Sequence, residues 1–504
     1  MLRRFLHNTA ISAVAYGLAG VLGLLAVGLI ARSYGVAVLG LIVLARAFLP
    51  SGFLALVDLG VSEITTQAVA RGRGGDWAVA SEKVSLLAVI AGATGIASGM
   101  VLWICAASLA MIFKVAPDET EAFVSILSVT AFVLPIAFLG LIAEGALKGF
   151  EEYGWLRLTE VGSNALYVAA VYVAVWRGAP FEWIAYSYLA TIVVKYFILG
   201  FVACLLARSS RMLRLISWGR DSRQDVIHRC WLMFNSRIVG TLQQTAPPLL
   251  IGVLFTPTEV GTFDLLTRLP RFLKATMAPL YSVILPISTH IEESTDTRRL
   301  QMLGRNGLIL PAAIVIPVLV VIGLFSQEIL RVWVGPQHAD QWPWMALSLF
   351  IPAVSIMLGA GQTALIVRPD FLRLNTRYLY WQVFTQYAVT ALTIVWFRER
   401  AFILGWVLSH VVFAPLIARG MLSFMSLPRS LFWDQVRRQA VVAVILAVTI
   451  GAYKMYLSPV SFAGLVVVGG LGCIAAWVLS AALILSPKDR AMFGRFMRAF
   501  TQRQ

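Results

Sequence analysis

The sequence contains little charge and few cysteines. Asp, Glu, Lys and Arg together make up 13% of its 504 residues, whereas 59% are hydrophobic and the mean hydropathy is +0.81. A water-soluble protein of this length could not hydrate so apolar a surface, which indicates a polytopic membrane protein. The four cysteines are scattered without metal-site or redox spacing, so the sequence indicates no disulfide framework and no zinc site.

Long polar connections and nucleotide-binding loops are missing as well. No loop is large enough to fold by itself, so the sequence offers no soluble catalytic domain. We therefore expect no enzymatic activity, no cofactor and no metal. Nothing resembles a loop that cradles ATP phosphates, which leaves the membrane potential or a coupled ion as the energy source.

What the chain does contain is a series of apolar stretches. About fourteen of them, each roughly 18 to 28 residues long, could cross a bilayer as helices. We therefore predict an all-α polytopic membrane protein. Prolines crowd spans seven and eight, which predicts bent helices that either line a cavity or simply improve packing. The expected spans are approximately 11–30, 39–61, 84–113, 123–147, 158–176, 183–206, 231–255, 262–287, 308–325, 344–366, 378–397, 402–424, 440–457 and 462–484.

Positive charge is unevenly distributed among the loops. The net charge is +16. About 28 Lys and Arg fall on one set of alternating loops and tails and about 7 on the other, which is the positive-inside pattern. Both termini are therefore predicted to be cytoplasmic. This orientation, together with attraction to anionic lipid, explains the excess charge, so we expect no nucleic-acid partner.

One pattern occurs twice, at positions that differ by 221 (261 minus 40). In the first half, ARSYGVAVLG leads into a span where Gly40 is followed by Arg46. In the second half, FTPTEVG leads into a span where Gly261 is followed by Arg268. Because a helix rises about 1.5 Å per residue, both guanidiniums are expected on the order of 10 Å below the same membrane face. A cation at that depth is costly unless it faces a polar interior, so both are candidate site residues.

The spans predict a repeat. Six spans precede the most basic connection, so both halves enter the membrane in the same direction, as in transporters built from parallel repeats around a cavity. The predicted organisation is an N-terminal lobe of six spans (1–207), a basic cytoplasmic linker (208–230), a C-terminal lobe of six spans (231–427), and a segment with two more spans and a basic cytoplasmic tail (428–504).

Span eight carries several charges on one helical face. At 100° per residue, Asp264, Arg268 and Arg271 lie within about 60° of one another, and Lys274 lies at the margin of this face. Pairing of Asp264 with Arg268 would leave the face net positive. These side chains either form a structural network or line a cationic cavity, and the number of cations favours the cavity. Such a cavity suits phosphate and pyrophosphate, which guanidinium groups bind bidentately.

Other ionisable residues are candidates because of their depth. Lys195 lies near the middle of span six, whereas Arg237 in span seven is equally well explained as an interfacial anchor or as a ligand. His410 is the one histidine well inside a span, where packing is a commoner role than proton transfer. The candidates for ion coupling are Asp58, Asp264, Glu144 and His410.

Several segments resemble a known family. ARSYGVAVLG, followed after span two by VDLGVSEITTQAVAR, is similar to the N-terminal signature of Wzx-type polysaccharide flippases, in the polysaccharide transport branch of the MOP superfamily. ALKGFEEYGWL resembles their cytoplasmic turn after span four, and FTPTEVGTFDLLTRL resembles the start of their second lobe. LRVWVGPQHADQWPW resembles their outer loop after span nine.

The resemblance implies a fold and a function. Two six-helix lobes form a V around a central cavity, with two additional helices, and move an undecaprenyl-pyrophosphate-linked oligosaccharide to the periplasmic leaflet by alternating access. Arg46 and Arg268 fall where the family holds the anionic head group. Localisation in the bacterial inner membrane follows, with membrane lipids, a polysaccharide polymerase and a chain-length regulator as expected partners.

Three alternatives remain open. A MATE-like ion/drug antiporter of the same superfamily would depend on the acids rather than the arginines. A peptidoglycan-precursor (lipid II) flippase would have a similar cationic cavity. A membrane glycosyltransferase or polymerase would need an acid pair in an outer loop, where a solvated turn accounts for the cluster Asp118, Glu119 and Glu121.

Overall fold

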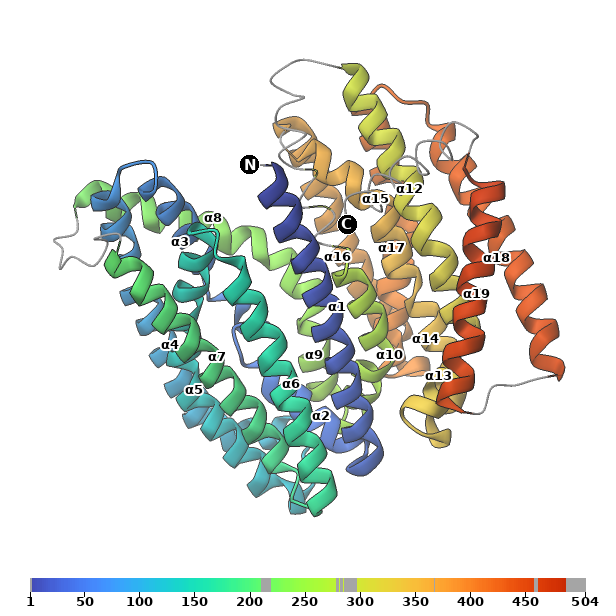
Figure 1. Ribbon diagram of the computed structural model, residues 1–504. Helices are drawn as coiled ribbons and strands as arrows, with labels where there is room; N and C mark the ends of the chain where they lie inside the picture. The colour runs from blue at the N-terminus through green and yellow to red at the C-terminus, as the bar shows by residue number, and fades with distance from the viewer. Residues whose placement is uncertain are drawn as a thin grey trace. The chain divides into compact units, whose positions relative to one another are not determined.

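The fold is helical throughout the part of the chain that the structure describes. The computed structural model describes residues 2–209, 219–277, 281, 284, 297–366, 368–456 and 461–485 (Figure 1). Every regular element among them is an α-helix or a 3-10 helix, which confirms the predicted all-α class. Residues 210–218 of the predicted linker and all of the predicted tail beyond 485 lie outside these residues.

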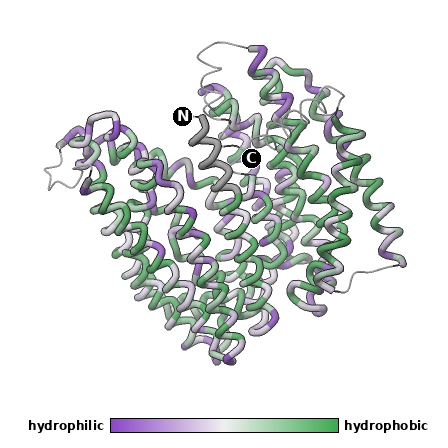
Figure 2. The backbone as a smooth tube through the Cα atoms, in the orientation of Figure 1, coloured by the Kyte–Doolittle hydropathy of each residue, from purple (hydrophilic) through white to green (hydrophobic). Residues whose placement is uncertain are grey.

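Ten helices among the described residues are long and apolar enough to cross a membrane. Of the other four predicted spans, spans two and seven are each interrupted, span eight lies partly outside the described residues, and span eleven coincides with α16 (Pro369–Phe397). Large hydrophobic side chains lie exposed along these helices, for example Phe132 (73%), Trp396 (75%) and Val395 (81%). Hydrophilic residues gather toward helix ends, while hydrophobic ones occupy the lengths between (Figure 2). Exposed apolar area on this scale requires lipid contact, so the chain is a multi-pass membrane protein.

By their contacts the residues form two compact units, Met1–Leu265 and Leu266–Gln504. In the first unit, five long helices pack in pairs: α4 lies along α5, α1 lies along α6, and α7 contacts both α5 and α6. Their bounds are α1 (Leu2–Ser33), α4 (Trp77–Ile112), α5 (Pro117–Gly149), α6 (Tyr153–Arg177) and α7 (Glu182–Ser209).

The remaining helices of the first unit are interrupted. Predicted span two becomes α2 (Gly35–Ala47) and the 3-10 helix η1 (Phe53–Leu56), after which Leu59 and Gly60, both with positive φ, lead into α3 (Val61–Gly72). Predicted span seven breaks at Thr245, between α8 (Arg220–Gln244) and α9 (Ala246–Leu254). The two prolines that open α9 have no N–H to continue α8, which explains the break.

The glycines of the repeated pattern meet in this unit. Helix α2 crosses the start of α10 (Pro257–Ala275), where a Cβ added at Gly40 would lie 1.7 Å from the Pro257 carbonyl oxygen. A Cβ at Gly261 would lie 2.0 Å from the carbonyl oxygen of Val36. Only glycine allows the two backbones to touch here. The repeated glycine is therefore a requirement of one helix crossing.

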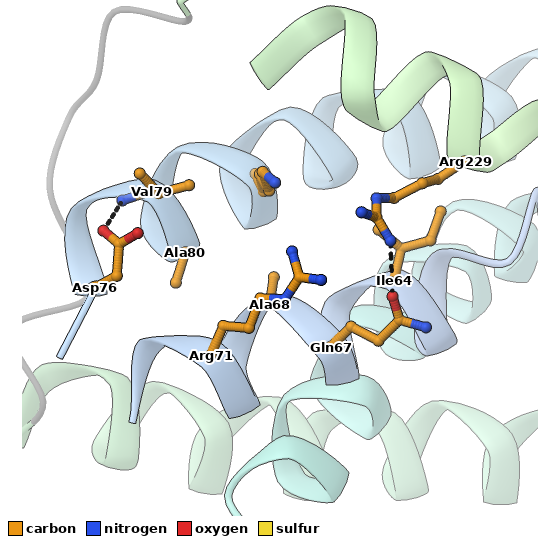
Figure 3. A pocket seen from close by; sticks show the side chains of 9 residues that line it. Ile64, Gln67, Ala68, Arg71, Asp76, Val79, Ala80 and Arg229 are labelled. Carbon is orange, nitrogen blue, oxygen red and sulfur yellow. Dashed lines mark hydrogen bonds between the residues drawn. The ribbon is translucent and has the colours of Figure 1, made fainter. Parts of the chain in front are cut away.

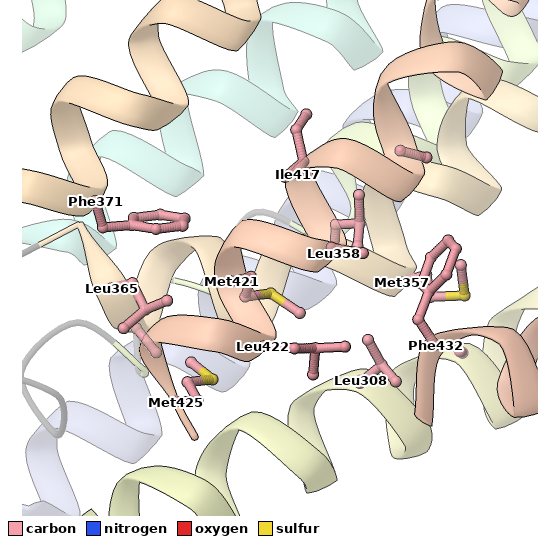
Figure 4. Close-up of a cluster of buried hydrophobic side chains, with 14 of the residues drawn as sticks. Leu308, Met357, Leu358, Leu365, Phe371, Ile417, Met421, Leu422, Met425 and Phe432 are labelled. Atoms are coloured by element: carbon pink, nitrogen blue, oxygen red, sulfur yellow. The ribbon is translucent and has the colours of Figure 1, made fainter. Parts of the chain in front are cut away.

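The second unit has its own core. Helices α16 and α17 pack together, α15 packs against α12 and α17, and both α18 and α19 pack against α12. A cluster of buried apolar side chains from five of these helices fills the space between them (Figure 4). The bounds are α12 (Thr297–Leu324), α13 (Ser326–Trp333), η2 (Pro336–Gln341), α14 (Trp342–Ser348), α15 (Phe350–Leu365), α17 (Arg400–Phe424), α18 (Ser430–Tyr456) and α19 (Phe462–Leu483).

The replacement Gly40→Ala should destabilise the protein by about 3 kcal/mol or more, because the added methyl meets fixed backbone rather than a movable side chain. Gly200→Ala is the matched control, since a Cβ there meets nothing within 4 Å and alanine is the better helix former. Thermal unfolding of the detergent-purified variants measures both. Equal melting temperatures for the two variants would contradict the close crossing.

Candidate functional site

Arg46 lies in an aromatic cage within the first unit. Its guanidinium carbon is 3.7 Å from the centre of the Tyr188 ring and 5.0 Å from that of Tyr167. The two rings, from α7 and α6, meet edge to face with their centres 5.2 Å apart. The cavity beside Arg46 measures about 10 Å³, which is at most the space of one water. In this conformation Arg46 is held by π faces, and the cage has no room for a phosphate group.

An acid from span eight accompanies this cation. Asp264 on α10 is 1% exposed, and its charge acts on the Arg46 guanidinium. The helix crossing at Gly40 and Gly261 explains the placement, because Asp264 lies one turn beyond Gly261. The structure thus brings together a predicted binding cation and a predicted coupling acid. The Nε and Nη2 atoms of Arg46 are buried without a hydrogen bond among the described residues.

A second charged group in this unit surrounds Glu144 on α5. Its Oε1 atom lies 2.8 Å from Nζ of Lys148, one turn further along the helix. Lys195 from α7 and Arg157 from α6 also act on this carboxylate. Arg157 in turn pairs with Glu160 at 2.6 Å. We call these five side chains the Glu144 cluster; three cations and two acids give it a formal charge of +1.

The Glu144 cluster joins two sequence predictions and adds residues that sequence reasoning missed. Lys195 was a predicted ligand and Glu144 a predicted coupling acid, and the two now lie in one electrostatic group. Lys148, Arg157 and Glu160 were not singled out. Their spacing carried a signal, because Glu144–Lys148 and Arg157–Glu160 are pairs at i,i+4 and i,i+3. The side chains of Glu144, Lys148, Arg157 and Glu160 are between 14% and 32% exposed, and Lys195 is also partly exposed.

Arg237 has a different environment. It forms an ion pair with Asp58, and its Nη2 lies 2.7 Å from Oε2 of Glu63. Asp58 also accepts a hydrogen bond of 2.8 Å from the backbone N–H of Gly60. The arginine therefore ties α8 both to the segment between η1 and α3 and to α3 itself. This geometry favours the anchor over the ligand role for Arg237, and it gives the predicted coupling acid Asp58 a cation that it shares with Glu63.

The remaining candidates belong to the second unit. Arg268, Arg271 and Lys274 lie on successive turns of α10 and are all partly exposed. Lys274 acts electrostatically on His410 of α17, which is 6% exposed. Nδ1 of His410 lies 2.9 Å from the carbonyl oxygen of Trp406, so that nitrogen carries the proton. The hydrogen bond to its own helix fits a packing role for His410. Because Lys274 acts electrostatically on the ring, the predicted coupling role of His410 stays a prediction.

The described residues hold no cluster of three or more His, Cys, Asp or Glu side chains that would suit a metal ion.

A sequence model of the family described as polysaccharide biosynthesis protein matches residues 29–343. This is more than half of the chain. The chain belongs to the polysaccharide biosynthesis protein family. All the candidate residues except His410 lie within the match, and the predicted resemblance to polysaccharide flippases is confirmed.

Solved structures show the same fold. The lipid II flippase MurJ in an inward closed conformation is similar with a TM-score of 0.70 and 12% identity, over 94% of this chain and 98% of that one. An inward-facing multidrug resistance MATE family transporter of the MOP superfamily is similar with a TM-score of 0.62 and 13% identity, over 82% and 94% of the two chains. A search of curated protein sequences finds no significant match. The chain therefore shares its fold with a flippase and with a multidrug transporter.

The Arg46 cage makes a prediction about stability. Tyr188→Leu should cost about 2 kcal/mol, because a desolvated cation loses its closest π face. Tyr188→Phe keeps that face and should stay within about 0.5 kcal/mol of the wild type. Thermal unfolding in detergent measures the difference, and the same pair of variants in an Arg46→Met background is the control. If Leu and Phe still differ by as much without the arginine, the cage interaction is refuted.

Proposed function

We propose that the protein moves an undecaprenyl-pyrophosphate-linked oligosaccharide from the cytoplasmic to the periplasmic leaflet of the bacterial inner membrane, for the synthesis of a surface polysaccharide. The observation that carries this proposal is the family match over residues 29–343. The fold shared with MurJ and a MATE transporter supports movement of a ligand across the membrane. The charges inside the helices support an anionic head group, because they are predominantly arginine and lysine.

The head group would bind to partly exposed cations. In the first unit these are Lys148, Arg157 and Lys195 of the Glu144 cluster. In the second unit they are the cations on successive turns of α10. Arginine presents paired N–H groups to two phosphate oxygens, and lysine adds a compact charge, so both suit pyrophosphate. The oligosaccharide would follow the head group while the prenyl chain stays in lipid.

Glu144 would act as the counter-ion of the empty cluster. It holds Lys148 at 2.8 Å and acts with Lys195 and Arg157. A pyrophosphate diester competes for the same cations, because it carries negative charge on both phosphorus centres. A carboxylate displaced by this competition takes up a proton more readily, which would link substrate binding to proton movement. This is the form in which we propose its coupling role.

The interrupted helices would supply the conformational change. Alternating access requires segments that can bend without breaking the rest of the bundle. Breaks occur between α2 and η1 and between α8 and α9, and Pro270 lies inside α10. The Arg46 cage would stay closed while the head group occupies the more exposed cations. Arg46 would then orient α2 through its contacts with Tyr167, Tyr188 and Asp264. Alternatively, it would contact the head group after the cage opens.

A lipid II flippase is the second candidate, since the structural similarity to MurJ extends over 94% of this chain. Both candidates require the same pyrophosphate chemistry and differ in the sugar. A MATE-like antiporter is less well supported, because the Glu144 cluster has more cations than acids. Complementation separates the three: a host lacking its polysaccharide flippase, a host depleted of its lipid II flippase, and a host sensitised to cationic drugs.

Arg157→Gln and Arg268→Gln should each reduce surface polysaccharide in a flippase-deficient host about tenfold or more, because each removes a cation proposed to hold the head group. Arg177→Gln is the matched control, since Arg177 lies exposed at the far end of the same helix as Arg157. Polymer is measured on cells with equal amounts of folded protein in the membrane. Normal polymer from both test variants would exclude the cationic site. Rescue of lipid II flippase depletion by the wild type would shift the function to the second candidate.

A further inference from the structure

A basic pocket lies outside the charged groups described so far. It is formed by α3, α4 and α8 at the end of the first unit that the charge pattern predicts to be cytoplasmic (Figure 3). Its volume is about 70 Å³, whereas one water needs about 10–15 Å³ of such space. The pocket can therefore hold a group the size of phosphate. Its walls are formed by Ile64, Gln67, Ala68, Arg71, Asp76, Val79, Ala80, Lys83 and Arg229.

Three cations from three helices meet at this pocket. Arg71 belongs to α3, Lys83 to α4 and Arg229 to α8. Figure 3 shows the Arg71 guanidinium directed into the space between these helices, and no described residue forms a hydrogen bond or an ion pair with it. Arg71 is thus a bidentate donor without a bound acceptor.

The other two cations are held in place from outside the pocket. Asp225 accepts a hydrogen bond of 2.6 Å from Nζ of Lys83 and one of 2.9 Å from Nε of Arg229. Nη1 of Arg229 donates to the amide oxygen of Gln67 at 3.0 Å. The hydrogen bond from Lys83, followed by that from Arg229, holds the pKa of Asp225 below its usual range. Asp225 therefore remains ionised at neutral pH and keeps both cations oriented.

The charge balance favours an anion. Asp76 is the one acid in the pocket wall, and its Oδ1 faces the backbone N–H of Val79 at the start of α4 (Figure 3). With Asp225 included, three cations meet two acids, and the surplus is on Arg71. The predicted cytoplasmic leaflet carries anionic lipid, which concentrates phosphate groups at this depth. Arginine and lysine together are the side chains that bind such groups.

We propose that the pocket between α3, α4 and α8 binds a phosphate group through Arg71, Lys83 and Arg229, carried either by an anionic phospholipid head group or by free phosphate. The bound group would join α8 to α3 and α4 within the first unit. It would thereby reinforce the contact that Arg237, also on α8, makes with Asp58 and Glu63. An anion at this site would stabilise the conformation described here.

The proposal is tested on the full-length protein in detergent, by titration with dioctanoyl-phosphatidylglycerol, dioctanoyl-phosphatidylcholine and inorganic phosphate at fixed ionic strength. Arg71→Gln should weaken the binding of phosphatidylglycerol or inorganic phosphate, whichever the wild type binds, about tenfold, because the bidentate contact is lost. Arg71→Lys should give an intermediate affinity. Arg223→Gln is the matched control: Arg223 is exposed on the same face of the membrane, on α8, and does not line the pocket.

The outcomes separate the sources of the phosphate. Arg71-dependent binding of phosphatidylglycerol alone supports the lipid head group, and Arg71-dependent binding of inorganic phosphate supports the free anion. Equal loss in Arg71→Gln and Arg223→Gln would mean diffuse attraction to a basic surface and would overturn the proposal. Unchanged affinity in a folded Arg71→Gln protein, judged by gel filtration and circular dichroism, would overturn it too.

Discussion

The backbone contact between α2 and α10 determines how charge is buried in the first unit. At Gly40 and Gly261 no side chain separates the two helices. One turn further along α10, the same approach brings Asp264 close enough to act on Arg46. A larger residue at either glycine would push the acid away from the cation and leave the guanidinium with its aromatic neighbours only. The burial of the Arg46 charge in a membrane therefore depends on two uncharged residues, Gly40 and Gly261.

Charged side chains of the first unit link different helices, in addition to pairing along one helix. Arg237 joins α8 to the segment before α3, and the Glu144 cluster joins three helices. Such networks are tolerated inside a membrane because the partners reduce the cost of removing each ion from water. They also give the fold its polar points of attachment, since apolar contacts between helices compete with equally apolar lipid.

Sequence reasoning recovered the class, the approximate spans and the family because these depend on composition and on local motifs. It identified Arg237 and Asp58 separately but not their ion pair, since the two residues are 179 positions apart (237 minus 58). It also treated span two as one helix, because hydropathy alone does not reveal that the helix ends after Ala47. Arg157 was missed because a charge near a span end is usually a solvated one, whereas here it lies over the Tyr16 ring.

The Arg46 cage has a consequence for biosynthesis. Tyr188 is 142 residues after Arg46 (188 minus 46) and Asp264 is 218 residues after it (264 minus 46). At a synthesis rate of about 5–20 residues per second, the acid emerges on the order of 10 to 40 s after the guanidinium has entered the membrane. During that interval the rings of Tyr167 and Tyr188 arrive first. The nascent first half can therefore shelter its own cation before the second half exists.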